Sequence, residues 1–289
     1  MTSIIKIVSK SYEITLNKLK VMKILLATDY SKHAGIALQY AVDIAHTMDA
    51  ELHVLHVHNN YVYDEINLGL EEEAFKASEN AMSELMAGVL PLLKTKHIPQ
   101  FNVIAGDTKH ETIKYIEEEK IDLLIVGTEG KKNMNNLLFG STAKALVNNV
   151  DIPILVIPEH DFNTFNSKSI LLALDNKEVN DQSIFHIPNA LSKAYEMNYN
   201  ILHVKKEGED DFPFDPIVLN YVTAPLSEIE IYENKSVVDG INSYVSKDNK
   251  TGLIIMIKRE EGFFKSLFSI SQTSKEIFNT PTPLLILKN

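Results

Sequence analysis

The sequence predicts an α/β fold with mostly parallel sheets that are flanked by helices. A sheet with its helices forms one unit, and we expect two such units in tandem. Between Lys23 and Ile157, short apolar segments alternate with longer amphipathic ones, and this alternation is typical of a parallel sheet with helical crossovers. After residue 168, strand patterns of the first half recur in the same order. The recurrence indicates a tandem duplication.

The elements of the first half follow from hydrophobic periodicity. The apolar run before Gly127 lacks the polar alternation of a half-exposed strand, so we expect this strand to be covered on both faces. Strands are expected at 23–28, 51–57, 100–104, 122–126 and 153–157. Helices are expected at about 32–48, 69–96, 108–119 and 140–149.

Three segments of the second half carry the repeat. Residues 169–175 match the first strand and its terminal aspartate, residues 201–204 match the second strand, and residues 282–287 match the last one. The order of the three matches is the same in both halves. We therefore expect the same architecture twice.

The second copy is expected to lack the long second helix. Asp175 follows Asp29 by 146 residues, whereas Thr282 follows Ile152 by 130, so about 16 residues are missing in between. The acidic segment Glu207–Pro225 contains three prolines where the first copy has that helix. Because proline inside a helix costs about 3 kcal/mol or more, we expect the helix to be broken or replaced by a loop.

These patterns divide the chain into a leader, two domains and a linker. The leader mixes apolar and basic residues, and Glu13 and scattered lysines interrupt any amphipathic targeting pattern, which favours a peripheral strand or arm. The expected ranges are 1–21 for the leader, 22–158 for the first domain, 159–168 for the linker and 169–289 for the second domain.

Composition excludes several classes of function. A formal charge of -11 repels the nucleic-acid backbone, and Lys131-Lys132 is only a pair, so no nucleic-acid partner is expected. The absence of cysteine excludes thiolate catalysis and cysteine-ligated metals. No apolar run approaches the roughly 20 residues of a membrane helix. A cytoplasmic location without membrane contact is the expectation.

A strand, a glycine loop and a helix start follow one another in the first half. Gly127 ends the strand, Gly130 lies in the loop, and Gly140-Ser141-Thr142 opens an amphipathic helix. Such a helix start collects unpaired N–H groups and the positive end of the helix dipole, so a phosphate would be well placed there. The alternative is that the glycines only make a tight turn with ordinary capping.

The spacing Gly-x2-Gly-x9-Gly-Ser, together with Asp29 at the end of the first strand, resembles the ATP-binding pattern of the universal stress protein family. The likeness covers roughly residues 22–158, and a weaker copy covers the rest. It implies two tandem, Rossmann-like five-stranded sheets of strand order 3-2-1-4-5, with ATP, with or without Mg2+, as the cofactor. It also implies that the last strands of the copies, 153–157 and 283–287, pair edge to edge, as in a dimer of single-domain relatives. A homodimer of the whole chain stays open.

The expected site lies beyond the carboxyl ends of the strands, where the strand order reverses. Asp29 is expected to hold ribose or a phosphate-bound Mg2+, and its alternative role is a cap for the helix that starts near Ser31. Ala27, Thr28 and Val57 fall on family positions that line the adenine side, with ordinary core positions as the alternative. The expected nucleotide-binding residues are Ala27, Thr28, Asp29, Val57, Val126, Gly127, Gly130, Gly140, Ser141 and Thr142.

The second copy departs from this pattern. Ile257, Glu260 and Ile270 stand at the positions of the three glycines, and Ser271 alone matches. Side chains would fill the space that a backbone needs to approach phosphate, so we expect no triphosphate there. Gly262 leaves open a loop that is shifted along the sequence.

No metal site or catalytic group is expected. His53 and His56 point to opposite faces of a strand, and His56 with His58 lacks a carboxylate partner, so the histidines favour core and surface roles. The acidic runs 71–73 and 117–119 are expected on solvated helix faces. Glu129 leaves slow ATP hydrolysis open, although a carboxylate beside phosphates is unfavourable.

The sequence therefore predicts an ATP-binding universal stress protein that acts as a sensor of stress or energy state, with the second domain structural or regulatory. One alternative is a protein interaction module with vestigial nucleotide sites that works through the acidic segment Glu207–Asp215. A slow ATPase or an ATP-using transferase is another, but no residues for a second substrate are visible. The protein partner is left unidentified.

Overall fold

The computed structural model describes residues 21–59, 68–128, 140–158, 165, 167–205, 215–234, 236–248, 250–259 and 281–289. The first half contains β1 (Lys23–Ala27), α2 (Lys32–Thr47), β2 (Glu51–His58), α3 (Leu68–Val89), β3 (Gln100–Ala105), α4 (Thr108–Glu119), β4 (Leu123–Gly127), α5 (Ser141–Asn149) and β5 (Ile154–Ile157). The second half contains β6 (Ser169–Leu174), the 3-10 helix η2 (Gln182–Phe185), α6 (His186–Tyr195), β7 (Asn198–Lys205), the 3-10 helix η3 (Pro216–Asn220), β8 (Leu226–Glu233), α7 (Val237–Asp248), β9 (Thr251–Lys258) and β10 (Leu284–Lys288).

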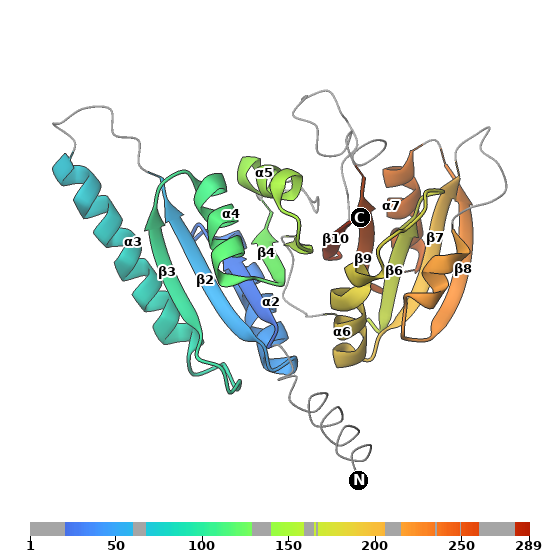
Figure 1. Ribbon diagram of the computed structural model, residues 1–289, viewed down its shortest axis with the longest axis horizontal. Helices are drawn as coiled ribbons and strands as arrows, with labels where there is room; N and C mark the ends of the chain where they lie inside the picture. The colour runs from blue at the N-terminus through green and yellow to red at the C-terminus, as the bar shows by residue number, and fades with distance from the viewer. Residues whose placement is uncertain are drawn as a thin grey trace, which may run out of the picture.

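The strands form one sheet of ten, in the order β3-β2-β1-β4-β5-β10-β9-β6-β7-β8 (Figure 1). Each half has the strand order 3-2-1-4-5 when its own strands are counted along the chain, which confirms the predicted fold class. Neighbouring strands within each half run parallel. The inner strands, such as β4 and β9, are buried on both faces, as their continuous apolar sequences require. The outermost strands β3 and β8 are partly or largely exposed.

The two halves meet where β5 and β10 pair edge to edge. This pairing is antiparallel, with Leu155 opposite Leu285 and Ile154 opposite Ile286. The expected pairing of the last strands is therefore present within one chain. It removes the free strand edge that each half would otherwise expose.

Side chains also cross from one half to the other. The hydroxyl of Tyr195 in α6 donates a hydrogen bond of 2.7 Å to Asp43 Oδ2 in α2. Lys258 Nζ donates to the carbonyl oxygen of Val147 at 2.6 Å, and burial holds the pKa of this lysine below its usual value. These contacts fix the halves to each other on both sides of the sheet.

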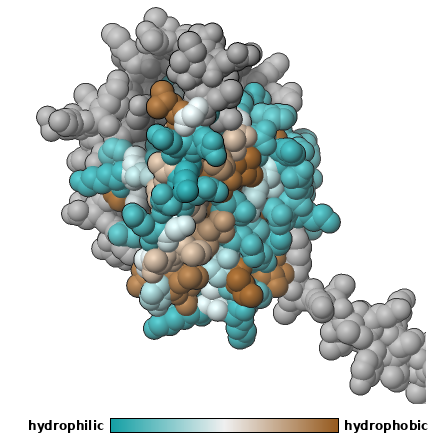
Figure 2. All heavy atoms as spheres, turned by 90° about the vertical axis from the view of Figure 1, so that its left-hand side faces the viewer, coloured by the Kyte–Doolittle hydropathy of each residue, from teal (hydrophilic) through white to brown (hydrophobic). Residues whose placement is uncertain are grey.

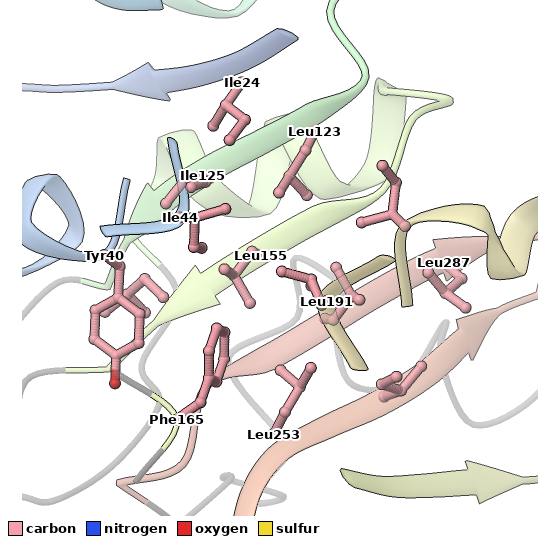
Figure 3. Close-up of a cluster of buried hydrophobic side chains, with 14 of the residues drawn as sticks. Ile24, Tyr40, Ile44, Leu123, Ile125, Leu155, Phe165, Leu191, Leu253 and Leu287 are labelled. Carbon is pink, nitrogen blue, oxygen red and sulfur yellow. The ribbon is translucent and has the colours of Figure 1, made fainter. Parts of the chain in front are cut away.

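One hydrophobic cluster passes without interruption through the junction of the halves. Figure 3 shows Ile24, Ile44, Leu155 and Leu287 within it, from elements of both halves. Phe165, from the segment that connects the halves, is buried there between Tyr40 and Tyr195, with ring centroids at 5.8 and 4.8 Å. Phe165 falls in the expected linker between the domains, so its burial is a finding of the structure.

Helix α3 is shorter than its periodicity suggested. It ends at Val89, whereas the expected end was about residue 96. Pro91 explains the difference, because proline has no N–H and excludes the residue before it from helical geometry. Short turns follow, with Leu92 N and Leu93 N both bonded to Val89 O.

The outer face of α3 is solvated. Figure 2 shows this end of the molecule, where hydrophilic residues predominate and hydrophobic residues lie between them. Glu72 and Glu73 are exposed, as expected, whereas Glu71 is half-buried and lies 3.5 Å from His58 Nε2. None of the described helices combines the length and the apolar composition that crossing a membrane requires.

The second half has no counterpart of α3 among its described residues. Residues 215–225 instead form η3 and an extended stretch, and Asp215 caps η3 by accepting from Ile217 N at 3.0 Å. The described residues of the segment 207–225 thus contain no long helix, which agrees with the predicted loss of that helix. The leader, Gly130 and Glu129, and the expected loop residues Glu260, Gly262, Ile270 and Ser271 lie outside the described residues.

Candidate functional site

A cavity of about 480 Å³ opens at the carboxyl ends of β1, β2 and β4. Every expected nucleotide-binding residue within the described ranges lines it, and Gly130 lies outside those ranges. They come from the ends of the three strands and from the first turn of α5, which parallel topology brings to one edge of the sheet. The expected residues on its wall are Ala27, Thr28, Asp29, Val57, Val126, Gly127, Gly140, Ser141 and Thr142.

Other lining residues were not expected from the sequence. They come from the starts of α2 and α4, from β2, from the residue after β4, and from α5. The sequence could have indicated the residues from α2 and α4, because both helices begin shortly after the carboxyl ends of β1 and β3. The additional residues are Ser31, His33, Ala34, Leu55, His56, Thr108, Thr112, Thr128, Ala143 and Leu146.

The first turn of α5 lacks a side-chain cap. Its N-cap residue is Gly140, with φ -59° and ψ 164°, and among the described residues no side chain caps the first amides. Helices α2 and α4 differ: Ser31 caps α2 by accepting from Ala34 N at 3.2 Å, and Asp107 caps α4 by accepting from His110 N at 2.9 Å. The first amides of α5 and the positive end of its dipole therefore lie at the cavity edge, and no capping side chain among the described residues offsets them.

Gly127 makes room for the start of α2. A Cβ atom at this position would lie 3.2 Å from the carbonyl oxygen of His33, which is backbone and cannot swing away. The sequence predicted close approach at Gly127. The structure shows that the approaching group is the first turn of α2, so the glycine shapes one wall of the cavity.

Asp29 takes part in the turn that starts α2. Its Oδ1 accepts from Ser31 N at 2.9 Å, so it supports the residue that caps α2, whereas the N-cap itself is Ser31. The side chain is exposed at the cavity edge. The hydrogen bond of the turn uses Oδ1 and does not involve Oδ2. A carboxylate held by one oxygen and presented by the other is a suitable acceptor for ribose hydroxyls or a ligand for a hydrated cation.

His56 and Tyr30 form a stacked pair beside the cavity. Their ring centroids lie 4.3 Å apart, and His56 Nδ1 donates to Thr28 O at 2.9 Å. Burial lowers the pKa of His56 below 6.5, more than its bond to the Thr28 carbonyl raises it. Burial also raises the pKa of Tyr30 to about 12, and its hydroxyl donates to Ser78 O in α3. At neutral pH the ring of His56 is therefore uncharged, with Nε2 as an acceptor.

The histidines of β2 are held by protein partners. His53 lies between the Tyr115 hydroxyl and Glu51, at 2.8 and 3.0 Å. His58 Nδ1 lies 3.1 Å from Ser78 Oγ. Within the ranges that the structure describes, no three histidine or carboxylate side chains form a group that could hold a metal ion.

The corresponding crevice of the second half has a bulky side chain where the first half has Gly127. Ala27 pairs with Val126 in the first half and Ala173 with Met256 in the second, so the next residue, Ile257, occupies the position of Gly127. Ile257 is buried.

Arg259 then reaches Asp175, the counterpart of Asp29. Its guanidinium donates to both carboxylate oxygens, at 3.0 and 3.3 Å. It also donates to the carbonyl oxygens of Glu178 and Lys177, at 2.8 and 3.1 Å. The carboxylate at the position of Asp29 is thus paired with an arginine of the chain itself in the second half.

Comparison with known proteins agrees with this architecture. The model of the universal stress protein family matches residues 20–158. A universal stress protein A homolog of Coxiella burnetii is 30% identical over 141 residues, which are 46% of this chain and 94% of that protein. The crystal structure of a universal stress protein from Archaeoglobus fulgidus covers 92% of this chain and 98% of its own, with 20% identity and a TM-score of 0.68. That structure shares the fold through both halves.

A universal stress protein family protein of Arabidopsis thaliana, solved with AMP bound, is 17% identical, covers 50% of this chain and 95% of its own, and has a TM-score of 0.37. The family assignment depends instead on the family model and on the Coxiella relative, nearly all of which the first half matches. The chain belongs to the universal stress protein family.

Proposed function

We propose that this protein binds an adenine nucleotide, with ATP as the expected ligand, in the cavity of its first half. Occupancy of the cavity would report energy state or stress to a regulatory partner. The observation that carries the proposal is the convergence of the motif residues on one cavity that ends at a helix start without a side-chain cap. The nucleotide-binding domain is proposed to span residues 22–158, followed by a linker at 159–168 and a degenerate copy at 169–289.

The phosphates would lie at the start of α5. Three features of this end of the cavity favour phosphate binding. Gly127 and Gly140 have no side chains, no side chain among the described residues caps the first amides of α5, and Ser141 and Thr142 are exposed with their hydroxyl groups. Backbone N–H groups and a helix dipole stabilise phosphate charge without a lysine. Gly130 would extend this cradle.

The ribose and any Mg2+ would lie beside Asp29. Its Oδ1 is fixed by Ser31 N, so the carboxylate is oriented before a ligand arrives. Oδ2 is then available to a ribose hydroxyl or to a phosphate-bound cation. A preoriented group loses little entropy on binding.

The base would lie over the apolar floor. Ala27, Leu55, Val57 and Val126 supply this floor from the ends of three adjacent strands. A planar base gains from burial against apolar side chains, with a few polar contacts fixing its orientation. In the second half Arg259 is bonded to Asp175, the counterpart of Asp29, and Ile257 occupies the position of Gly127, so one nucleotide per chain is proposed.

A protein interaction module is the second candidate. On the second half, Ile217, Leu226, Ile229 and Ile231 are each at least 38% exposed, and no counterpart of α3 covers this side within the described residues. Exposed apolar groups of this kind are typical of contact surfaces. This candidate becomes the leading one if the purified protein neither carries nor binds adenine nucleotide.

Calorimetric titration with Mg-ATP tests the proposal. Gly140→Val places a side chain at the start of α5, and we expect the affinity to fall at least tenfold. Gly88→Ala is the matched control, because nothing lies within 4 Å of the added atom, and its affinity should equal that of the natural sequence. Equal affinity for all three proteins would show that the assigned cavity is wrong. Chromatography of the supernatant from denatured protein would identify any nucleotide that copurifies.

A further inference from the structure

Thr112 is a buried polar residue in the wall of the cavity. It lies in α4, its exposed fraction is 0%, and it lines the same cavity as the motif residues. Its Oγ1 is almost fully buried and makes no hydrogen bond to any part of the chain that the structure describes. The hydroxyl is therefore buried and unpaired when the cavity is empty.

An unpaired hydroxyl at this position needs a physical explanation. A threonine in a helix commonly donates to the carbonyl four residues earlier, here Thr108 O, but Thr112 does not. Valine has the same shape and would avoid the cost of desolvating an unpaired polar atom. The choice of threonine is explained if a ligand in the cavity supplies the missing partner.

The position of α4 identifies which part of a ligand lies there. α4 packs on β2, and one turn after Thr112 its residues Tyr115 and Ile116 are buried in the same cluster as Leu55 and Val57. The start of α5 follows β4, which lies two strands from β2 in the sheet. Two strand spacings are about 10 Å, so the end of β2 on which α4 packs lies about that far from the end of β4, while α4 itself also packs against α5.

The surroundings of Thr112 also suit a neutral group. The described wall of the cavity contains no lysine or arginine, and near α4 it is formed by Leu55 and Val57. A charged phosphate would be poorly stabilised beside these side chains. A planar heterocycle with nitrogen atoms at its edge combines an apolar face with hydrogen-bonding groups.

We propose that the Thr112 hydroxyl hydrogen-bonds to the edge of the nucleotide base and is a specificity-determining residue of the cavity. This inference rests on the proposed function. The hydroxyl can donate to a ring nitrogen or accept from an exocyclic amino group. In either case Thr112 acts on the base and leaves the phosphates to the start of α5.

The test compares Thr112→Val with Thr251→Val by calorimetry, using AMP and ATP as ligands. Thr251 is a matched control because its Oγ1 is also buried and unpaired among the described residues, but it lies in β9 away from the cavity. We expect Thr112→Val to weaken both ligands by the same factor, about 5- to 30-fold, which is typical of one buried hydrogen bond. Thr251→Val should bind as the natural protein does.

Stability separates a ligand contact from a structural one. In the absence of nucleotide, the urea midpoint of Thr112→Val should be equal to or above that of the natural protein, because no internal hydrogen bond is lost. A lower midpoint would mean that the free protein already uses the hydroxyl, and the inference would be overturned.

The remaining outcomes are distinct. Unchanged affinity of Thr112→Val for both ligands refutes the base contact and leaves the proposed function standing. A loss for ATP alone would place the hydroxyl at the phosphates, which also overturns the inference. If the natural protein binds neither AMP nor ATP, the proposed function fails and the inference fails with it.

Discussion

The guanidinium of Arg259 lies 3.0 Å from Asp175 Oδ1, and this pair stands in the second half at the position where Asp29 borders an open cavity in the first. The arginine side chain is 10% exposed and the aspartate 43%. The two halves thus have crevices of the same topology. In the second crevice the aspartate is paired with Arg259 of the same chain. The asymmetry has direct consequences for stoichiometry.

Arg259→Gln is expected to leave the stoichiometry at one nucleotide per chain. Removing the guanidinium does not open the second crevice, because Ile257 still occupies the position of Gly127. The free energy of unfolding should fall by about 0.5–1 kcal/mol, since the pair is partly exposed. Calorimetry with Mg-ATP measures the stoichiometry, and a value of two for the variant would contradict the account.

Tyr195→Phe is expected to weaken the junction between the halves. The variant removes the hydrogen bond of 2.7 Å to Asp43 Oδ2 and leaves the ring in its cluster beside Phe165. A hydrogen bond to a charged group contributes about 1.5–3 kcal/mol, and urea unfolding should show a loss in this range. Asp43→Asn keeps the shape and should lose less. No loss in Tyr195→Phe would mean that the bond does not stabilise the junction.

Gly127→Val is expected to destabilise the protein by about 1–3 kcal/mol, because overpacking against the backbone of α2 forces the strand end or the helix to move. Nucleotide affinity should fall with it. Gly35→Ala is a control in α2 itself: nothing lies within 4 Å of its added atom, so it should stabilise the helix by about 0.5–1 kcal/mol. Thermal unfolding measures both. A neutral Gly127→Val would show that α2 does not approach so closely.

Much of the fold could be predicted because local patterns specify it. Apolar runs such as the one before Gly127 identify buried strands, and the repeated Asp175 aligns the halves without any structure. The strand order and the pairing of β5 with β10 came from family resemblance. Pro91 is a helix-ending signal in the sequence. The expected helix was nevertheless extended to about residue 96 because the apolar periodicity continues beyond the proline.

The cavity was predictable where one continuous motif forms it and less so where separate elements meet. Gly127, Gly140 and Ser141 belong to one spacing pattern. Thr112 lies in a helix whose sequence reads as an ordinary amphipathic surface helix, and only packing against β2 brings its hydroxyl to the cavity. The pair of Arg259 and Asp175 joins residues 84 positions apart, and neither residue has a local pattern that indicates the other.

Stability is expected to fall as the pH drops through about 6.5. Burial lowers the pKa of His53 and of His56 below 6.5, so between the folded and unfolded values the unfolded chain binds more protons. In the neutral ring, Nε2–H donates to Glu51 and Nδ1 can accept from the Tyr115 hydroxyl, an arrangement that protonation of Nδ1 removes. Each histidine contributes at most about 1.4 kcal/mol per pH unit in this window.

Urea unfolding of the natural protein and of His53→Gln/His56→Asn at pH 7.5 and pH 5.5 measures this effect. The natural protein should lose more stability between the two values than the double variant does. Equal losses would show that these buried rings do not cause the pH dependence.

Photo-crosslinking with 8-azido-ATP, followed by mass mapping of the labelled peptides, tests the location of the nucleotide most directly. The label is expected in peptides of residues 22–158, from the walls of the cavity, with unlabelled ATP in excess abolishing it. Label confined to residues 169–289, or shared equally by the two halves, would contradict a single nucleotide site in the first half.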